Sequence, residues 1–212
     1  MKKTGLLFVG VLSLTALTSC GDAELAEKAE GTWQTTLNMK NEEGMPYEQT
    51  QIYSFTNDKN SGKDGGTFVE YLTNVAKEEE EGIVVNYTVT STITGSWEVL
   101  FGDLCITYNL SSLDVNVNEV NYKLSDDVSP GMALDYWSAS IDAAMEGYEL
   151  IGRNELKKEI RKEVYNSLLD EYEKFNADRE ENGSVFADLK IENGIMSFMT
   201  SDVGCMEFKR VE

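Results

Sequence analysis

The sequence contains no histidine among its 212 residues. Histidine is the usual acid or base near neutral pH and the commonest metal ligand, so this absence excludes Ser-His-Asp catalysis, Cys-His catalysis and histidine-based zinc sites. Cysteine is scarce too, with three residues in the chain. Apart from Cys20, only Cys105 and Cys205 remain, which are too few for a disulfide scaffold and lack metal-ligand spacing. They form either one bridge or two free thiols.

Basic residues are also few, with 18 Lys and Arg against 38 Asp and Glu, and the formal net charge is -20. A field of this sign disfavours nucleic acid and anionic bilayer surfaces as partners. Acidic residues are clustered at 126–127 and at 78–81. Both stretches are turn-like and solvated, so the sequence gives no reason to expect a shifted carboxyl pKa there. The sequence therefore predicts a protein that is not an enzyme and uses no cofactor.

A glycine-rich stretch at 57–66 superficially resembles a calcium-binding loop. It holds Asp58 and Asp64 at suitable spacing, but Lys59 and Lys63 lie among these acids. The twelfth position counted from Asp58 is Val69, where a calcium loop needs a bidentate glutamate. The pattern favours an ordinary hairpin loop, and no metal site is predicted.

The N-terminus begins with Lys2 and Lys3, followed by an apolar run at 6–16 that is too short to cross a bilayer as a stable anchor. The sequence Leu-Thr-Ser-Cys at 17–20 closes this run and resembles a bacterial lipobox. The resemblance implies that residues 1–19 are a cleaved signal peptide. It also implies that Cys20 carries lipid, palmitate included, and holds the protein at a membrane.

Residues 20–30 are small, acidic and alanine-rich, as expected of a lipidated tether that ends in a short helical turn. The acids Asp22, Glu24 and Glu27 resemble the acidic signal that sends some lipoproteins of Bacteroidetes to the cell surface. A solvated linker would have the same composition. The location is therefore the outer membrane, either at the cell surface or on the periplasmic face.

Alternating apolar and polar residues predict a series of two-sided strands from Gly31 onward. The longest run spans 83–101 and needs a bend, which is expected at Gly95. A two-residue turn at 102–103 would place the apolar side chains of two strands on one face and leave Cys105 on the other. The expected pairs are Phe101 with Leu104, Val99 with Ile106 and Trp97 with Tyr108.

The period changes after Leu110, where the strand pattern fades into a polar stretch. Apolar residues recur every three or four positions over about 131–177, which predicts a two-helix insertion parted near Gly152, with Asn154 as the cap of the second helix. Strands then return on either side of the Asn-Gly turn at 193–194 and in the final run at 205–211.

Gly-Thr-Trp at 31–33, the meander that follows, and Arg210 on the last strand resemble the lipocalin-like barrels of the calycin superfamily, and in particular the lipocalin-like lipoproteins of Bacteroidetes. The resemblance implies a mainly β fold, an antiparallel barrel at 31–212 interrupted by the helices. It also implies that an inward Arg210 stacks on Trp33 and closes one end of the barrel. The apolar stripe of the helices is then expected to cover the other end.

A barrel of this kind implies a protein that binds a small, partly apolar molecule inside. The aromatic residues on the expected inner face are the candidate ligand-binding residues: Tyr53, Phe55, Tyr87, Trp97 and Tyr108. Small barrels are often filled by their own side chains, however. The alternative is a non-catalytic cell-surface interaction or accessory protein with a packed barrel, whose protein partner is unknown.

Overall fold

The computed structural model describes residues 21–40, 46–59, 64–80, 83–124, 134–182, 186–200 and 204–211, without the side chains of 46, 78–80, 83, 122–124, 134–153 and 181–182. The proposed signal peptide and Cys20 lie outside the described residues. Positions 60–63 of the stretch that resembles a calcium loop lie outside them as well.

Within these residues, the chain forms one antiparallel sheet of eight strands and one long helix, in addition to a short helix at 21–29. The predicted mainly β, antiparallel class is confirmed. The elements are β1 (Gly31–Lys40), β2 (Pro46–Asn57), β3 (Gly65–Glu80), β4 (Ile83–Leu100), β5 (Asp103–Leu124), α2 (Leu134–Asn182), β6 (Ala187–Glu192), β7 (Ile195–Thr200) and β8 (Gly204–Val211).

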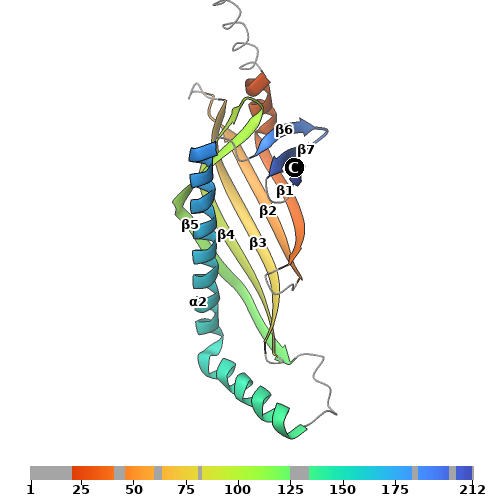
Figure 1. Cartoon of the computed structure of the whole chain (residues 1–212), viewed down its shortest axis with the longest axis vertical. Coiled ribbons are helices and arrows are strands. Elements are labelled where there is room, and N and C mark those ends of the chain that lie inside the picture. Colours follow the sequence, from red (N-terminus) through yellow and green to blue (C-terminus); the bar gives the residue numbers. More distant parts are fainter. Residues whose placement is uncertain are drawn as a thin grey trace, which may run out of the picture.

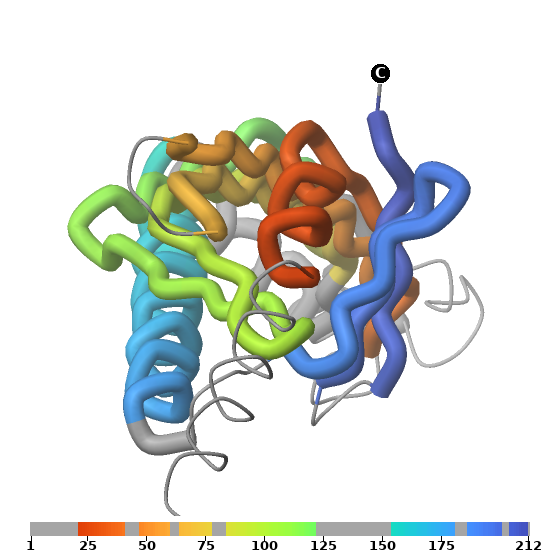
Figure 2. Tube along the Cα trace, turned by 90° about the horizontal axis from the view of Figure 1, so that it is seen from above, coloured from red at the N-terminus to blue at the C-terminus, as the bar shows by residue number. Residues whose placement is uncertain are grey.

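The strand order is β5-β4-β3-β2-β1-β8-β7-β6, so the first strand lies beside the last. The sheet curls until its two edge strands meet at one end, as the view from above shows (Figure 2). There the N–H of Leu104 donates to the carbonyl of Phe186, and the N–H of Leu189 donates to the carbonyl of Gly102, both at 2.9 Å. The contact between β5 and β6 is one isolated bridge, not a continuous ladder.

Helix α2 lies along β5 and covers the part of this edge strand that β6 does not reach (Figure 1). The Nζ of Lys157 donates to the carbonyl of Asn118 at 2.8 Å. Farther along the helix, the side chain of Asn176 accepts from the N–H of Tyr108 and donates to its carbonyl, both at 2.9 Å. These bonds satisfy backbone groups that an edge strand otherwise leaves to solvent.

This position of α2 corrects two expectations from the sequence. The helix is continuous from Leu134 to Asn182, instead of two helices parted near Gly152, and Figure 1 shows that it changes direction in its first half. Asn154 is therefore an internal residue, not a cap. The helix also flanks the side of the sheet instead of covering one end, because the open edge of β5 offers both apolar surface and unpaired backbone groups.

The turn between β4 and β5 differs from its expected position by one residue. Phe101 and Gly102 form the two-residue turn, and both have positive φ, 56° and 84°. This is the backbone that primed turns require. Trp97, Val99, Leu104 and Ile106 are buried, as predicted, and Cys105 faces the other way. Phe101, expected on the buried face, is 82 % exposed in the turn. The pairs are Leu100 with Asp103, Val99 with Leu104 and Trp97 with Ile106.

The register of the β4–β5 pair does not shift at Gly95 itself, where the sequence predicts a bend. It shifts between Thr88 and Val89 and again between Thr92 and Thr94. Gly95 serves a different purpose, because a Cβ there would lie 2.5 Å from the ring of Phe68. The glycine lets this ring pack against the backbone. Beyond Leu110, β5 remains paired with β4 through both shifts to its end at residue 124, so the strand does not fade at Leu110.

The short helix at 21–29 docks against the sheet. The carboxylate of Asp22 accepts from the N–H of Phe101 at 2.9 Å and from that of Gly102 at 2.8 Å. Ala26 and Ala29 are buried, and the carbonyl of Ala29 accepts from the indole N–H of Trp33 at 2.8 Å. Thus the expected tether is part of the fold over these residues.

Trp33 is fully buried, and the guanidinium carbon of Arg210 lies 4.5 Å from the centroid of its ring. The contact that the resemblance implies is therefore present. Arg210 is not an inward residue, however, because its side chain is exposed and donates to the carbonyl of Lys28 at 2.6 Å. An exposed cation–π contact contributes only about 0.5–1 kcal/mol.

Of the two alternatives for the cysteines, the structure shows free thiols. Cys105 is buried on the outward side of β5, and Cys205 is exposed on β8. Burial raises the pKa of the Cys105 thiol. The sheet therefore needs no disulfide to hold these strands.

Candidate functional site

A cavity of about 400 Å³ lies between α2 and the inner face of the sheet. Strands β1, β2, β3, β5, β7 and β8 supply lining residues on the sheet side, and α2 forms the opposite wall. The volume is in the range of pockets that hold small organic molecules. Aromatic rings make up much of the wall: Tyr53, Tyr108, Tyr172, Phe175, Phe186, Phe198 and Phe208.

The alternation of the strands explains which side chains reach this cavity. On β2, Gln51 and Tyr53 face inward, and they pair across the sheet with Leu72 and Glu70 of β3. All four line the cavity. A glutamate is thus placed on the inner face of β3, between the apolar residues Phe68 and Leu72.

Glu70 is the charged residue at the floor of the cavity, and only 2 % of its surface is exposed. Its Oε1 accepts a hydrogen bond from the Nε2 of Gln51 at 2.8 Å, and the hydroxyl of Tyr172 lies 3.5 Å from the same oxygen. The other oxygen, Oε2, is buried and has no hydrogen-bond partner in the part of the chain that the structure describes. Burial raises the pKa of Glu70 to about 7, although the Gln51 amide acts in the opposite direction.

Two tyrosines extend this polar centre. The hydroxyls of Tyr53 and Tyr108 lie 3.0 Å apart, and the Nε2 of Gln51 donates to the Tyr53 hydroxyl at 2.9 Å. Burial raises the pKa of both phenols well above the usual value, and the nearby Glu70 acts in the same direction. Both hydroxyls therefore stay neutral and can orient a polar group of a ligand.

The rim of the cavity carries charges from α2, namely those of Glu171, Lys174 and Asp178. The Nζ of Lys174 is 2.6 Å from a carboxylate oxygen of Asp170, one turn earlier on the helix. With this lysine paired, the entrance has an excess of negative charge.

The structure brings together only part of the predicted ligand-binding set. Tyr53 and Tyr108 line the cavity. Phe55 and Trp97 are buried beneath it, with their ring centroids 5.1 Å apart. Tyr87, half-buried near the far end of β4, lines a different pocket. The residues that the sequence patterns did not single out are Glu70, Gln51 and Tyr172.

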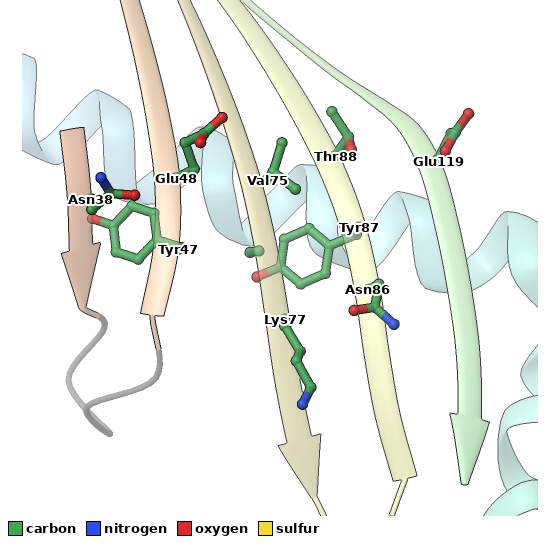
Figure 3. A pocket seen from close by; sticks show the side chains of 10 residues that line it. Asn38, Tyr47, Glu48, Val75, Lys77, Asn86, Tyr87, Thr88 and Glu119 are labelled. Atoms are coloured by element: carbon green, nitrogen blue, oxygen red, sulfur yellow. The ribbon is translucent and has the colours of Figure 1, made fainter. Parts of the chain in front are cut away.

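The pocket lined by Tyr87 has a volume of about 390 Å³ and is a groove on the outside of the sheet. Figure 3 shows it with the helix passing behind the strands. Half of its lining residues form one row that pairs across neighbouring strands. Their side chains are exposed or half-buried: Asn38, Glu48, Val75, Thr88 and Glu119. None of these five carries a buried polar atom that lacks a partner. The interior cavity is therefore the better candidate site.

The described part of the chain contains no cluster of three or more Cys, Asp or Glu side chains that could hold a metal ion. In that part, no helix is both long enough and apolar enough to cross a membrane. No protein-family model and no curated protein matches the chain. The assignment of function therefore depends on the cavity and its residues.

Proposed function

We propose that this chain is a non-catalytic, membrane-anchored lipoprotein that binds a small, partly apolar molecule. The observation that carries the proposal is the cavity of about 400 Å³, which has aromatic walls and a polar centre at Glu70. Such a combination of apolar walls and few polar groups is typical of sites for small molecules. We also propose that the protein is a lipocalin-like barrel. The curled sheet, the bridge from Leu104 to Phe186 and the contact of Trp33 with Arg210 support this class.

The binding proposal is tested with the neutral apolar dye N-phenyl-1-naphthylamine, whose fluorescence rises in an apolar site. The purified full-length chain is expected to bind it saturably. Leu37 lines the cavity, so Leu37→Trp fills part of it and should weaken binding at least about tenfold, equivalent to about 1.4 kcal/mol.

The matched control is Leu100→Trp, which adds the same side chain at an exposed position on β4. It should leave dye binding unchanged. If both substitutions reduce binding equally, or if the full-length chain does not bind the dye saturably, the proposed function is wrong.

The membrane anchor is a separate part of the proposal and depends on the lipobox that ends at Cys20. Replacing this cysteine by alanine removes the sulfur that would carry the lipid. When expressed with its signal, the Cys20→Ala protein should move from the detergent phase to the aqueous phase in a phase-separation experiment. A variant that still partitions with detergent as the parent does would rule out lipidation at this site. The outer membrane, at the cell surface or on its periplasmic face, is the proposed location.

The alternative is a cell-surface interaction or accessory protein without a small ligand. A protein of this kind should have a packed interior and an exposed apolar patch. Tyr71 and Val75 are exposed on the outer face of β3 and would suit a partner. The interior is not fully packed, however, and this favours the ligand-binding proposal.

A further inference from the structure

Among the described residues, the buried carboxyl of Glu70 has no cationic partner. It accepts a hydrogen bond from the amide of Gln51 and lies 3.5 Å from the hydroxyl of Tyr172. Burial raises its pKa, and the neutral hydroxyls of Tyr108 and Tyr53 act to lower it. Lys174 is the only basic residue in the described lining of the cavity, and it pairs with Asp170. An ionised carboxylate that is desolvated and unpaired is costly, and a group that brings a positive charge to it removes this cost.

The aromatic rings near Glu70 are suited to a cation. The ring of Tyr108 lies 4.3 Å from that of Tyr172 and 5.1 Å from that of Phe175, measured between centroids. All three line the cavity. The faces of such rings are negative and attract ammonium groups, in particular where water is excluded.

The negative charge around the entrance also favours a cationic ligand. Glu171 and Asp178 stand at the rim, and the whole chain has a formal net charge of -20. A field of this sign raises the local concentration of cations and repels anions. Fatty acids and other carboxylates are therefore poor ligands for this cavity.

We propose that the ligand is a small organic cation, a protonated amine on an apolar body, with its ammonium group beside the carboxyl of Glu70. The apolar body lies against the aromatic wall and Leu72. This inference rests on the proposed function, because it assigns the class of ligand for the same cavity.

The arrangement also makes binding depend on pH. The titratable groups that face Glu70 are Tyr53 from β2, Tyr108 from β5, and Tyr172 with Glu171 from α2. Burial raises the pKa of the three phenols, so they stay neutral between pH 6 and 8. The empty site has a Glu70 pKa of about 7, and the ammonium binds only the ionised form. The affinity should therefore rise about tenfold from pH 6 to pH 8.

The test compares three probes that share a phenyl ring and a short side chain, using calorimetry on the full-length chain. They are 2-phenylethylamine, which is cationic at both pH values, neutral 2-phenylethanol and anionic phenylacetate. At pH 8 the amine should bind at least about tenfold more tightly than the alcohol, and phenylacetate should bind most weakly. At pH 6 the amine should lose about tenfold in affinity while the alcohol is unaffected.

Glu70→Gln keeps the size of the side chain and removes its charge. It should abolish both the preference for the amine and the pH effect, while binding of the alcohol changes by less than about threefold. The matched control is Glu192→Gln, which removes the same charge at an exposed position on β6 and should change none of these values. The pH comparison on the unsubstituted chain tests the proposal even if a variant does not fold.

Two results overturn the cation assignment but leave the proposed function standing. One is that the alcohol binds as tightly as the amine, or that the preference for the amine survives in Glu70→Gln. The other is that no probe binds although N-phenyl-1-naphthylamine does. If neither the dye nor any of the three probes binds, both proposals fail.

Discussion

Glu70→Gln is expected to make the protein more stable at pH 8 and to have a smaller effect at pH 5. The pKa of Glu70 rises from 4.5 to about 7 on folding, so between these values the folded chain holds a proton that the unfolded chain releases. The contribution of Glu70 to the free energy of unfolding is therefore most favourable below pH 4.5, and it is lost as the pH rises toward 7. Glutamine does not titrate, and its advantage over Glu70 should therefore grow by about 2–3 kcal/mol from pH 5 to pH 8.

Urea unfolding of the parent and the variant at both pH values measures this difference. Glu192→Gln, with its exposed side chain, should show no such growth. The many other carboxylates affect the parent and variant equally, so their contribution cancels in the comparison. An advantage that is the same at pH 5 and pH 8 would mean that Glu70 keeps its usual pKa in the folded chain.

Replacing Asn176 by alanine is expected to destabilise the fold by about 2–3 kcal/mol, since two partly buried backbone groups then lose their partners. These groups are the N–H and the carbonyl of Tyr108, which lie on the open edge of β5. Asn176→Asp should be destabilising as well, because a carboxylate can accept from the N–H but cannot donate to the carbonyl.

The control for this prediction is Asn154→Ala, at an exposed position of the same helix, which should change the unfolding free energy by less than about 0.5 kcal/mol. Hydrogen exchange gives a local readout. The amide of Tyr108 should exchange faster in Asn176→Ala but not in Asn154→Ala. Unchanged protection of this amide would show that the asparagine does not hold the strand edge.

Strand alternation predicted most of the sheet and its buried faces, because each side chain of a strand meets either the core or solvent, but it missed the second half of β5 after Leu110. The turn at 101–102 was misplaced by one residue, since glycine tolerates either turn position and Phe101 is an unusual residue at positive φ. The route of α2 was not predictable from its apolar stripe. A stripe shows that a helix is docked, but it does not show whether the surface beneath it is the end of a sheet or the edge of a strand.

The candidate site was predictable only where it consists of large apolar rings. Tyr53 and Tyr108 were predicted because alternate residues of a strand face the inside of the sheet. The same alternation also selected Phe55 and Trp97, which pack below the cavity. Glu70 shares the inner face with Phe68 and Leu72, and an inward acid in that alternation was the available signal. The helical partner Tyr172 was not identifiable, because its contact with Tyr108 joins residues that are distant in the sequence.

The two hydrogen bonds of Asp22 join the N-terminal helix to the turn between β4 and β5. They therefore fix the position of the fold relative to a lipid on Cys20. They fix the chain to the β4–β5 turn two residues after Cys20, next to the exposed ring of Phe101. The cavity residue Phe186 lies beside this turn through its bridge to Leu104, whereas the cavity residue Met39 lies eight positions after Gly31 on β1, about 26 Å from Gly31 at the rise of a strand. With a lipid on Cys20, Asp22 would lie two positions from the lipid, so the turn at 101–102 would be held close to the bilayer with little slack.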